Sequence, residues 1–233
     1  MDRWLRRREP AAHPWHAMGA GLESEKEHAA RAAAEMVEDG MSVGLGTGTT
    51  VAHLLPALAS RRLSIRCTAT SPETARLATG LGLHVESFTS ARLDMAIDGA
   101  DQINPQGWLV KGGGGAHTRE KLVAVSADRF VVIADSSKPV AALHPPIPLE
   151  LMEFGLESTL ARLGTVRLRD VAHSPDGGVI ADFIGEVGDP DDLAAWLEAA
   201  PGVVDHGLFP PSLVSTVLVA RGVSVERIDF SSR

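Results

Sequence analysis

The sequence is poor in cysteine and lacks long apolar runs, and each shortage excludes a class of protein. Cys67 is the single cysteine among 233 residues, so the chain cannot form an internal disulfide or a zinc site with several thiolates, and a reducing compartment fits best. No apolar run approaches the roughly 18 residues of a membrane span. The N-terminus also lacks the apolar segment of a secretory signal. We therefore expect a cytoplasmic protein that does not enter membranes.

Basic side chains are fewer than acidic ones, with 22 Lys and Arg against 30 Asp and Glu and a formal net charge of -8. The phosphate backbone of nucleic acids favours a basic surface, so this balance argues against a general binder of DNA or RNA. Hydrophobic residues make up 44% of the chain, which is ample for a real core at this length. The totals predict a folded, globular protein that does not bind nucleic acid.

Residues 1–20 mix arginine, proline and small residues without periodicity, which is typical of a mobile N-terminal extension. The three arginines at 6–8 are interpreted as a solvated tail in preference to a contact with a partner. Ser24 and Glu27 then have the spacing of a capping box, and apolar residues follow at helical spacing as far as Gly40. A first helix is therefore expected with Ser24 as its N-cap.

From residue 41 onward, short apolar runs alternate with helical patterns, as in a parallel sheet that helices cover on both faces. A helix is expected from Val51 to Leu58, and another opens at Ser71 and Pro72. Strands are expected at 41–46, 63–71, 93–97 and 129–135. This order predicts a Rossmann-like α/β catalytic domain over residues 21–143.

Three prolines in "LHPPIPLE", residues 143–150, interrupt the alternation and indicate a domain boundary. The segment 144–208 is expected to form a small α+β domain, with a helix capped by Asp189. Two strand patterns close the sequence, and we expect residues 209–233 to complete the first domain. The other elements expected in the small domain are a helix around 150–163 and strands near 165–170, 178–185 and 203–208.

The segment "VGLGTGTTV", residues 43–51, runs from an expected strand through three alternating glycines and three threonines into a helix. Exposed amides, hydroxyl groups and the positive end of a helix suit a phosphate. No lysine follows the last glycine, so this is not a nucleotide P-loop, and Thr49 stands where a dinucleotide fingerprint has its third glycine. An ordinary strand-to-helix turn explains the pattern about as well.

The segment "IDGAD", residues 97–101, places Asp98 and Asp101 at the carboxyl end of an expected strand, where open α/β sheets bind ligands. Such carboxylates bind sugar hydroxyls or metal ions, although Asp and Gly are also common in plain turns. Lys138, in "IADSSKPV", follows another strand end. By default it is a surface lysine, and its position beside the other loops is what makes it a candidate.

Four consecutive glycines in "KGGGGAHTRE", residues 111–120, cost conformational entropy and add no side chain to a core. A flexible linker is disfavoured, because the sequence is apolar on both sides and continues directly into a helical pattern. The alternative is bare backbone beside a ligand, with Lys111 supplying positive charge and Glu120 a base. Glu120 and Lys121 also have a plainer interpretation as a solvated helix face.

These motifs occur in an order that resembles the type A ribose-5-phosphate isomerase family. The resemblance rests on "GLGTGTT", "TSPETARLATGLG", "DGADQI", "KGGGGAHTREK", "ADSSK" and "PGVVDHGLF", and it covers roughly residues 22–230. It implies a Rossmann-like domain with a smaller ferredoxin-like α+β domain and a homodimer or homotetramer. The implied activity, in the non-oxidative pentose phosphate pathway, interconverts D-ribose 5-phosphate and D-ribulose 5-phosphate without a cofactor or metal.

The resemblance also implies roles for individual residues. Glu120 becomes the base that moves the proton between C1 and C2, with Asp98 and Lys111 as its catalytic neighbours. The glycine amides stabilise the enediolate, the threonine loop and Lys138 hold the phosphate, and Lys26 matches a phosphate-contacting lysine. His117 matches no role and is expected to be a satisfied helix residue. The implied substrate-binding set is Lys26, Thr47, Gly48, Thr49, Thr50, Asp98, Gly99, Ala100, Asp101, Lys111, Gly112, Gly113, Gly114, Gly115 and Lys138.

Two questions stay open at the level of sequence. Burial would raise the pKa of Glu120, whereas Lys111 and a helix N-terminus would lower it. Related folds also serve as sugar-phosphate-sensing modules that bind without turnover, and another sugar-phosphate isomerase, such as an amino-sugar isomerase-deaminase, would use a similar set of loops. Formation of ketose from ribose 5-phosphate separates these alternatives.

Overall fold

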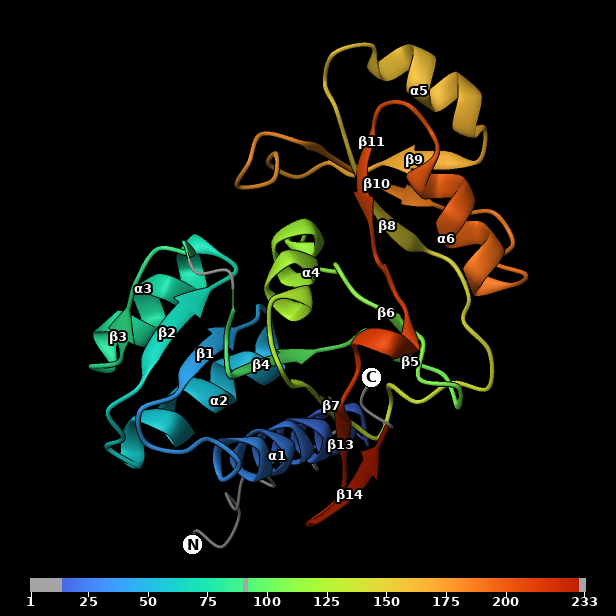
Figure 1. The fold of residues 1–233 in the computed structure, drawn as a ribbon. Helices are drawn as coiled ribbons and strands as arrows, with labels where there is room; N and C mark the ends of the chain where they lie inside the picture. Colours follow the sequence, from blue (N-terminus) through green and yellow to red (C-terminus); the bar gives the residue numbers. More distant parts are fainter. Residues whose placement is uncertain (1–13, 90–91, 231–233) are drawn as a thin grey trace, which may run out of the picture.

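The computed structural model describes residues 14–89 and 92–230 (Figure 1), and it describes side chains from residue 21 onward. Its largest sheet has seven strands in the order β14-β13-β7-β4-β1-β2-β3. All neighbours pair in parallel except β13 and β14, which form an antiparallel hairpin. The strands are β1 (Ser42–Leu45), β2 (Arg66–Ala69), β3 (His84–Val85), β4 (Met95–Gly99), β7 (Phe130–Asp135), β13 (Thr216–Arg221) and β14 (Ser224–Asp229).

The central strands β1 and β7 are buried along their whole length. Alternate side chains of such a strand point to opposite sides, so both faces of the sheet are covered there. On β7, Val131 and Ile133 pack with α1 (Pro14–Ala34) and α2 (Thr49–Ser60), whereas Phe130 and Val132 pack with α4 (His117–Val125) on the other face. Another helix, α3 (Pro72–Gly80), follows β2 and begins at the expected N-cap. There the side chain of Ser71 accepts a hydrogen bond from the backbone N–H of Thr74. The predicted Rossmann-like sheet is confirmed.

A second sheet is antiparallel, in the order β11-β8-β10-β9. Along the chain its elements run β-α-β-β-α-β, which is the ferredoxin-like arrangement. They are β8 (Ile147–Leu151), α5 (Leu156–Leu163), β9 (Val166–Leu168), β10 (Val179–Phe183), α6 (Pro190–Glu198) and β11 (Val203–His206). As expected, Asp189 caps α6 and accepts a hydrogen bond from the N–H of Asp191. Figure 1 shows α4 between the large sheet and this smaller unit.

A small three-stranded sheet, β12-β6-β5, lies at the junction of the two units. It pairs β12 (Leu208–Phe209), which follows the ferredoxin-like unit, with β6 (Leu109–Val110), which precedes the glycine run, and β6 in turn with β5 (Gln102–Ile103). The chain then passes through a short 3-10 turn (Pro211–Leu213) to β13, which pairs with β7. The closing strands therefore return to the large sheet, as the sequence predicts.

Two sequence-based expectations about elements are wrong. The first helix begins at Pro14 and not at Ser24, and proline suits the first turn of a helix because its missing N–H would have no partner there. The expected extension thus falls partly outside the described residues, at 1–13, and is helical from residue 14. The helix expected around 150–163 begins only at Leu156, and residues 150 and 151 belong instead to strand β8.

The helices within the described residues are either too short or too polar to cross a lipid bilayer.

Candidate active site

A cavity of about 130 Å³ opens where β1, β4, β6 and β7 end, and it gathers most of the residues expected to bind substrate. The loops after β1, β4 and β7 meet there because the carboxyl ends of parallel strands lie at one edge of a sheet, and β6 of the small sheet brings the glycine run to the same place. The lining residues are Thr47, Gly48, Thr49, Thr50, Gly99, Ala100, Asp101, Lys111, Gly112, Gly113, Gly114, Glu120 and Lys138.

One wall of this cavity is the N-terminus of α2. Gly48 is the N-cap and has a φ of 115°, a conformation that residues with a side chain rarely adopt. Thr49 and Thr50 form the first turn, where backbone N–H groups have no acceptor within the helix. Lys138, from the loop after β7, lines the same cavity. The positive helix end, the hydroxyl groups and the lysine together make an anion-binding surface.

A buried cluster of three charged side chains adjoins this surface. Lys111 Nζ lies 2.8 Å from Asp98 Oδ2 and 3.2 Å from Glu120 Oε2, and it donates a hydrogen bond to the Gly99 carbonyl at 2.6 Å. Asp98 also accepts from the backbone N–H of Thr47 at 3.1 Å and of Gly99 at 2.7 Å. No backbone amide of the described residues donates to Glu120, so its carboxylate is the less stabilised of the two.

Burial decides the protonation of this cluster. It raises the pKa of Glu120 to about 8, with the nearby charge of Asp98 acting in the same direction and Lys111 against it. Burial likewise raises the pKa of Asp98, although Lys111 and two amides oppose the shift. Burial disfavours the charge on Lys111, but the attraction of both carboxylates outweighs it and raises the lysine pKa. Glu120 is thus a carboxyl that gains and loses a proton near neutral pH.

Two backbone N–H groups of the glycine run already donate hydrogen bonds within the protein. The N–H of Gly113 donates to Asp101 Oδ2 at 2.8 Å, and that of Gly115 donates to the Gly112 carbonyl at 3.0 Å. Within the described residues, no acceptor meets the N–H groups of Gly112 and Gly114. Gly112 and Gly114 both line the cavity, so their amides are the ones that remain for a ligand.

The ring of His117 explains why residue 112 is a glycine, because it leaves no room for a side chain there. Gly112 has a φ of 102°, and a Cβ there would lie 2.7 Å from His117 Nδ1. The histidine is fully buried, and burial lowers its pKa to about 3. Neither ring nitrogen makes a hydrogen bond within the described part of the chain. The expectation of a satisfied helix residue is therefore wrong: His117 packs as a neutral ring beneath the glycines.

Segments distant in the sequence position Lys111. Its backbone N–H donates to the Gly207 carbonyl at 2.8 Å, and a Cβ on Gly207 would come within 2.1 Å of the Lys111 carbonyl oxygen. Phe209, on β12, lies beneath both Lys111 and Lys121, whose Nζ atoms are 5.4 and 5.1 Å from the ring centroid. The "PGVVDHGLF" motif is thus part of the wall that holds the lysine.

Three expected site residues do not line the cavity. Asp98 lies just behind it, buried against Lys111. Gly115 faces the small unit, since a Cβ there would meet Ile180 at 3.4 Å. Lys26, on α1, forms an ion pair with Glu23 at 2.5 Å.

The sequence analysis missed Gly46 as a site residue. A Cβ at Gly46 would lie 1.9 Å from the carboxyl carbon of Asp98, so the acid occupies the space that a side chain would take. The alternating glycines of "GLGTGTT" were a signal for this, but only the pairing of β1 with β4 shows which glycine faces Asp98. A second missed residue, Arg169, belongs to the small unit.

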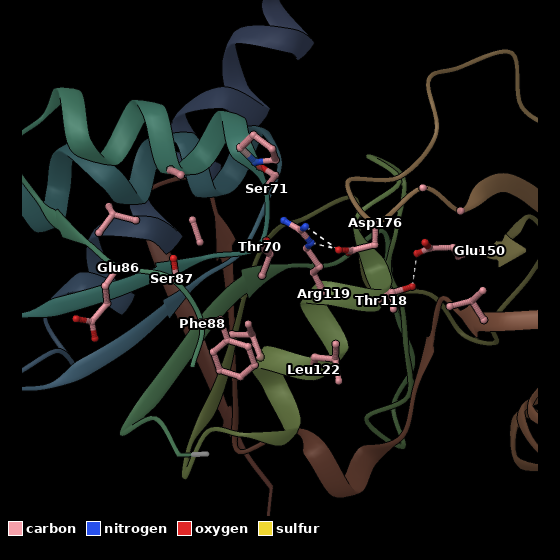
Figure 2. A pocket seen from close by; sticks show the side chains of 18 of the residues that line it. Thr70, Ser71, Glu86, Ser87, Phe88, Thr118, Arg119, Leu122, Glu150 and Asp176 are labelled. Carbon is pink, nitrogen blue, oxygen red and sulfur yellow. Dashed lines mark hydrogen bonds and ion pairs between the residues drawn. The ribbon is translucent and has the colours of Figure 1, made fainter. Parts of the chain in front are cut away.

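A larger cavity, of about 910 Å³, lies on another side of α4 (Figure 2). Among its charged groups, Arg119 meets Asp176 in a bidentate ion pair at 2.6 and 2.7 Å, and Glu150 accepts a hydrogen bond from Thr118. The rest of the lining is mostly apolar or hydroxylic, and Figure 2 shows Leu122 among these side chains. Its buried carboxylate, Glu150, accepts hydrogen bonds from Thr118 and Ser174, and among the described residues no lysine lines this cavity as Lys111 and Lys138 line the smaller one.

Comparison with known proteins agrees with this geometry. The family model for ribose 5-phosphate isomerase A (phosphoriboisomerase A) matches residues 66–223. A curated relative from Halobacterium salinarum, named ribose-5-phosphate isomerase A, is 44% identical over 203 residues, which cover 82% of this chain and 89% of the relative. This chain belongs to the ribose-5-phosphate isomerase A family.

Solved structures of ribose 5-phosphate isomerase share the fold. The one from Methanocaldococcus jannaschii has a TM-score of 0.84 at 32% identity and covers 89% of this chain and 99% of its own. A D-ribose-5-phosphate isomerase in complex with phospho-erythronic acid has a TM-score of 0.84 at 29% identity, covering 90% and 99%. A model for the DeoR C terminal sensor domain matches residues 23–80. The ribose-5-phosphate isomerase A match extends over more of the chain than the sensor match.

Proposed function

We propose that this chain is an aldose-ketose isomerase that interconverts D-ribose 5-phosphate and D-ribulose 5-phosphate through an enediolate. The observation that carries the proposal is the buried carboxylate of Glu120, 3.2 Å from Lys111 Nζ, in a cavity that also contains a helix N-terminus. A base, an ammonium group and unpaired amides are what removal of a proton beside a carbonyl requires. Membership of the ribose-5-phosphate isomerase A family supports the same reaction, a step of the non-oxidative pentose phosphate pathway.

The phosphate of the substrate would bind at the N-terminus of α2, between Thr47–Thr50 and Lys138. Support comes from the free amides of the first helical turn and from the lysine in the same cavity. Lys26 remains a candidate for this contact, and it would have to leave its ion pair with Glu23. Phospho-erythronic acid, the ligand named for one relative, also carries a phosphate and an acid group, and it is a suitable probe of binding.

The proton transfer would use the carboxylate of Glu120 twice. It takes the proton from C2 of the open-chain aldose, while the electron pair moves into a C1–C2 double bond and the carbonyl π electrons move onto O1. The same carboxyl then returns a proton to C1, and the hydroxyl proton of O2 passes to O1, so that C2 becomes the ketone and O1 a hydroxyl group. Lys111, Asp101 and the amide of Gly114 lie around the cavity where the oxygens carry negative charge.

Burial makes Glu120 suited to this double role. A pKa of about 8 lies near the working pH, so the carboxyl is ionised often enough to accept a proton and acidic enough to return it. The first turn of α4 and the ammonium of Lys111 would by themselves keep the carboxyl ionised. The absence of amide donors to Glu120 within the described residues is what lets burial outweigh them.

A binding module without turnover is the second candidate, because part of the chain matches a sensor-domain model. The retained base, Glu120, and its neighbour Lys111 favour the enzyme, since a module that only binds has no use for a buried base. Formation of ribulose 5-phosphate by the pure protein would exclude a sensor, and absence of turnover with retained binding would favour it.

The test of the enzyme is Glu120→Gln, which keeps the shape of the side chain and removes the base. The variant should fold and bind phospho-erythronic acid, yet lose on the order of 10²-fold to 10⁴-fold in turnover, the contribution typical of a positioned base. The measurement is exchange of the C2 proton of ribose 5-phosphate with deuterated solvent, followed by NMR.

The matched control is Glu157→Gln on α5, an exposed glutamate far along the chain from the cavity. It should leave both turnover and exchange at the level of the unmodified protein. If Glu120→Gln binds the probe normally and still exchanges the C2 proton at the original rate, Glu120 is not the base.

Finer features of the molecule are proposals as well. We infer a homodimer or homotetramer, supported by apolar side chains exposed beside the larger cavity, such as Phe154 and Leu122. The cytoplasm is the proposed compartment, in line with the single buried thiol of Cys67. The proposed domain limits are 21–143, completed by about 209–233, with 144–208 as the small domain.

A further inference from the structure

Arg169 connects the small unit to the glycine run of the candidate site. It follows β9 directly, and its guanidinium is anchored by Asp182 of β10, with Nε 3.0 Å from Oδ2 and Nη2 2.6 Å from Oδ1. The third nitrogen, Nη1, donates to two consecutive backbone carbonyls, those of Gly112 and Gly113, each at 3.0 Å. The side chain of Asp182 is buried, so this ion pair holds the guanidinium of Arg169 in a fixed position.

These two bonds fix the direction in which the neighbouring amides point. In a trans peptide the C=O of one residue and the N–H of the next point in opposite directions. When Arg169 holds the carbonyls of Gly112 and Gly113, the N–H groups of Gly113 and Gly114 therefore face away from it. The first of these donates to Asp101, which lines the active-site cavity, as Gly114 itself does.

Glycine makes this external support necessary. Residues without Cβ have many backbone conformations of similar energy, so a run of four glycines does not hold two amides in one direction by itself. Arginine fits the task because its planar group offers a fork to one carboxylate and further N–H donors to other acceptors. A lysine at this position would offer one ammonium group, which cannot match both sets of acceptors in the same geometry.

We propose that Arg169, held by Asp182, is a positioning residue for the reaction: it orients the Gly114 amide toward the oxygens of the enediolate and the Gly113 amide toward Asp101. The proposal rests on the proposed isomerase function. It assigns to the small unit a direct part in organising a site that is otherwise built from loops of the large sheet. Arg169 acts through the glycine backbone, without contact with the substrate.

The central variant is Arg169→Met, which keeps an unbranched apolar stem and removes both hydrogen-bonded ends of the side chain. We expect kcat with ribose 5-phosphate to fall about tenfold to 100-fold, since misplacing one stabilising donor has effects of this order. KM should change by less than about threefold, because the phosphate site lies in other loops. Arg169→Lys should give an intermediate kcat, and it keeps the proposal testable if the methionine variant does not fold.

Two arginines of this chain offer matched controls. Arg167→Met removes a charge 3.8 Å from the same Asp182 carboxylate, but Arg167 is exposed and forms no bond with the glycine carbonyls. Arg119→Met breaks another bidentate arginine–aspartate pair, the one with Asp176, without reaching the glycine run. Both controls should keep kcat within about twofold of the unmodified protein.

A second readout does not depend on activity. Hydrogen-deuterium exchange of the peptide spanning residues 112–116, measured by mass spectrometry, should become faster in Arg169→Met and stay unchanged in Arg167→Met. Unchanged kcat, unchanged exchange in this peptide, or an equal loss of kcat in Arg119→Met would each overturn the proposal. If the unmodified protein does not turn over ribose 5-phosphate, the isomerase proposal fails, and the exchange comparison alone decides whether Arg169 orders the glycines.

Discussion

At the scale of single residues, the candidate site depends on how one ammonium group is shared between two buried carboxylates. Asp98 has Lys111 and two backbone amides as donors, whereas Lys111 is the one donor that the described part of the chain offers to Glu120. With both carboxylates ionised the cluster carries a formal charge of minus one in a buried place, which is costly. The group with fewer donors is the one that takes up a proton first.

This imbalance predicts that Glu120→Gln stabilises the protein, and that the gain depends on pH. The folded state holds the Glu120 proton up to a pKa of about 8, and the unfolded chain releases it near 4.5. Between these values the folded state binds more protons, so its stability falls as pH rises. Glutamine does not titrate, so its advantage should be smallest below pH 4.5 and largest above pH 8.

Melting temperatures of the two proteins from pH 4 to 9 check this. Glu157→Gln should follow the unmodified protein throughout, since that side chain is exposed. A melting temperature of Glu120→Gln that lies below the original at pH 8 would mean that the lost contact with Lys111 outweighs relief of the buried charge.

At the scale of elements, local signals predicted most of the large sheet and its helices. Ser71 and Pro72 begin α3, and apolar β-branched runs became β1, β4 and β7. Strand β8 was missed because prolines usually exclude a central strand. Pro148 is tolerated because it lies beyond the last residue of β8 that pairs with β11, where its carbonyl accepts a hydrogen bond from Gly207.

The turn from β1 into α2 contains Gly46, and the carboxyl group of Asp98 occupies the space that a side chain at residue 46 would need. A substitution of Gly46 should therefore disturb the site. In Gly46→Ala the added methyl would lie 1.9 Å from the Asp98 carboxyl carbon, so the acid or the loop must move. We expect kcat/KM to fall on the order of 10²-fold, the scale of a small misplacement of catalytic groups.

Steady-state kinetics of Gly46→Ala and of Gly80→Ala measure this. Gly80 lies at the end of α3 with open space around its Cβ position, and alanine favours a helix, so this control should keep full activity. Full activity in Gly46→Ala would show that Asp98 need not stay in its place beside Lys111.

At the scale of the whole molecule, the candidate site depends on both the large sheet and the ferredoxin-like unit. Loops of the large sheet line the cavity, and Arg169 of the smaller unit holds the glycine run. Sequence motifs identified the loops that line the cavity, because each loop carries its own pattern of glycine, threonine and acid. Arg169 could not be found in this way, since it lies 56 residues or more from the carbonyls that it holds. Nothing in the local sequence of β9 distinguishes it from the exposed Arg167.

The proposed homo-oligomer is a further property of the whole molecule. Phe154 is 89% exposed and lines the larger cavity together with Met152 and Leu122, which are about half exposed. A patch of this kind on a free monomer is costly and marks a contact surface. If a second copy covers it, Phe154→Asp places a charge in the interface and should shift the protein toward the monomer mass of 24.6 kDa.

Light scattering after size exclusion, over a range of protein concentrations, measures that mass. The matched control is Val223→Asp, an 81% exposed side chain at the turn between β13 and β14, which should leave the mass of the unmodified protein unchanged. A multiple of 24.6 kDa that persists in Phe154→Asp would place the interface elsewhere. If the unmodified protein is a monomer at all concentrations, the homo-oligomer is wrong and the apolar patch beside α4 needs another occupant.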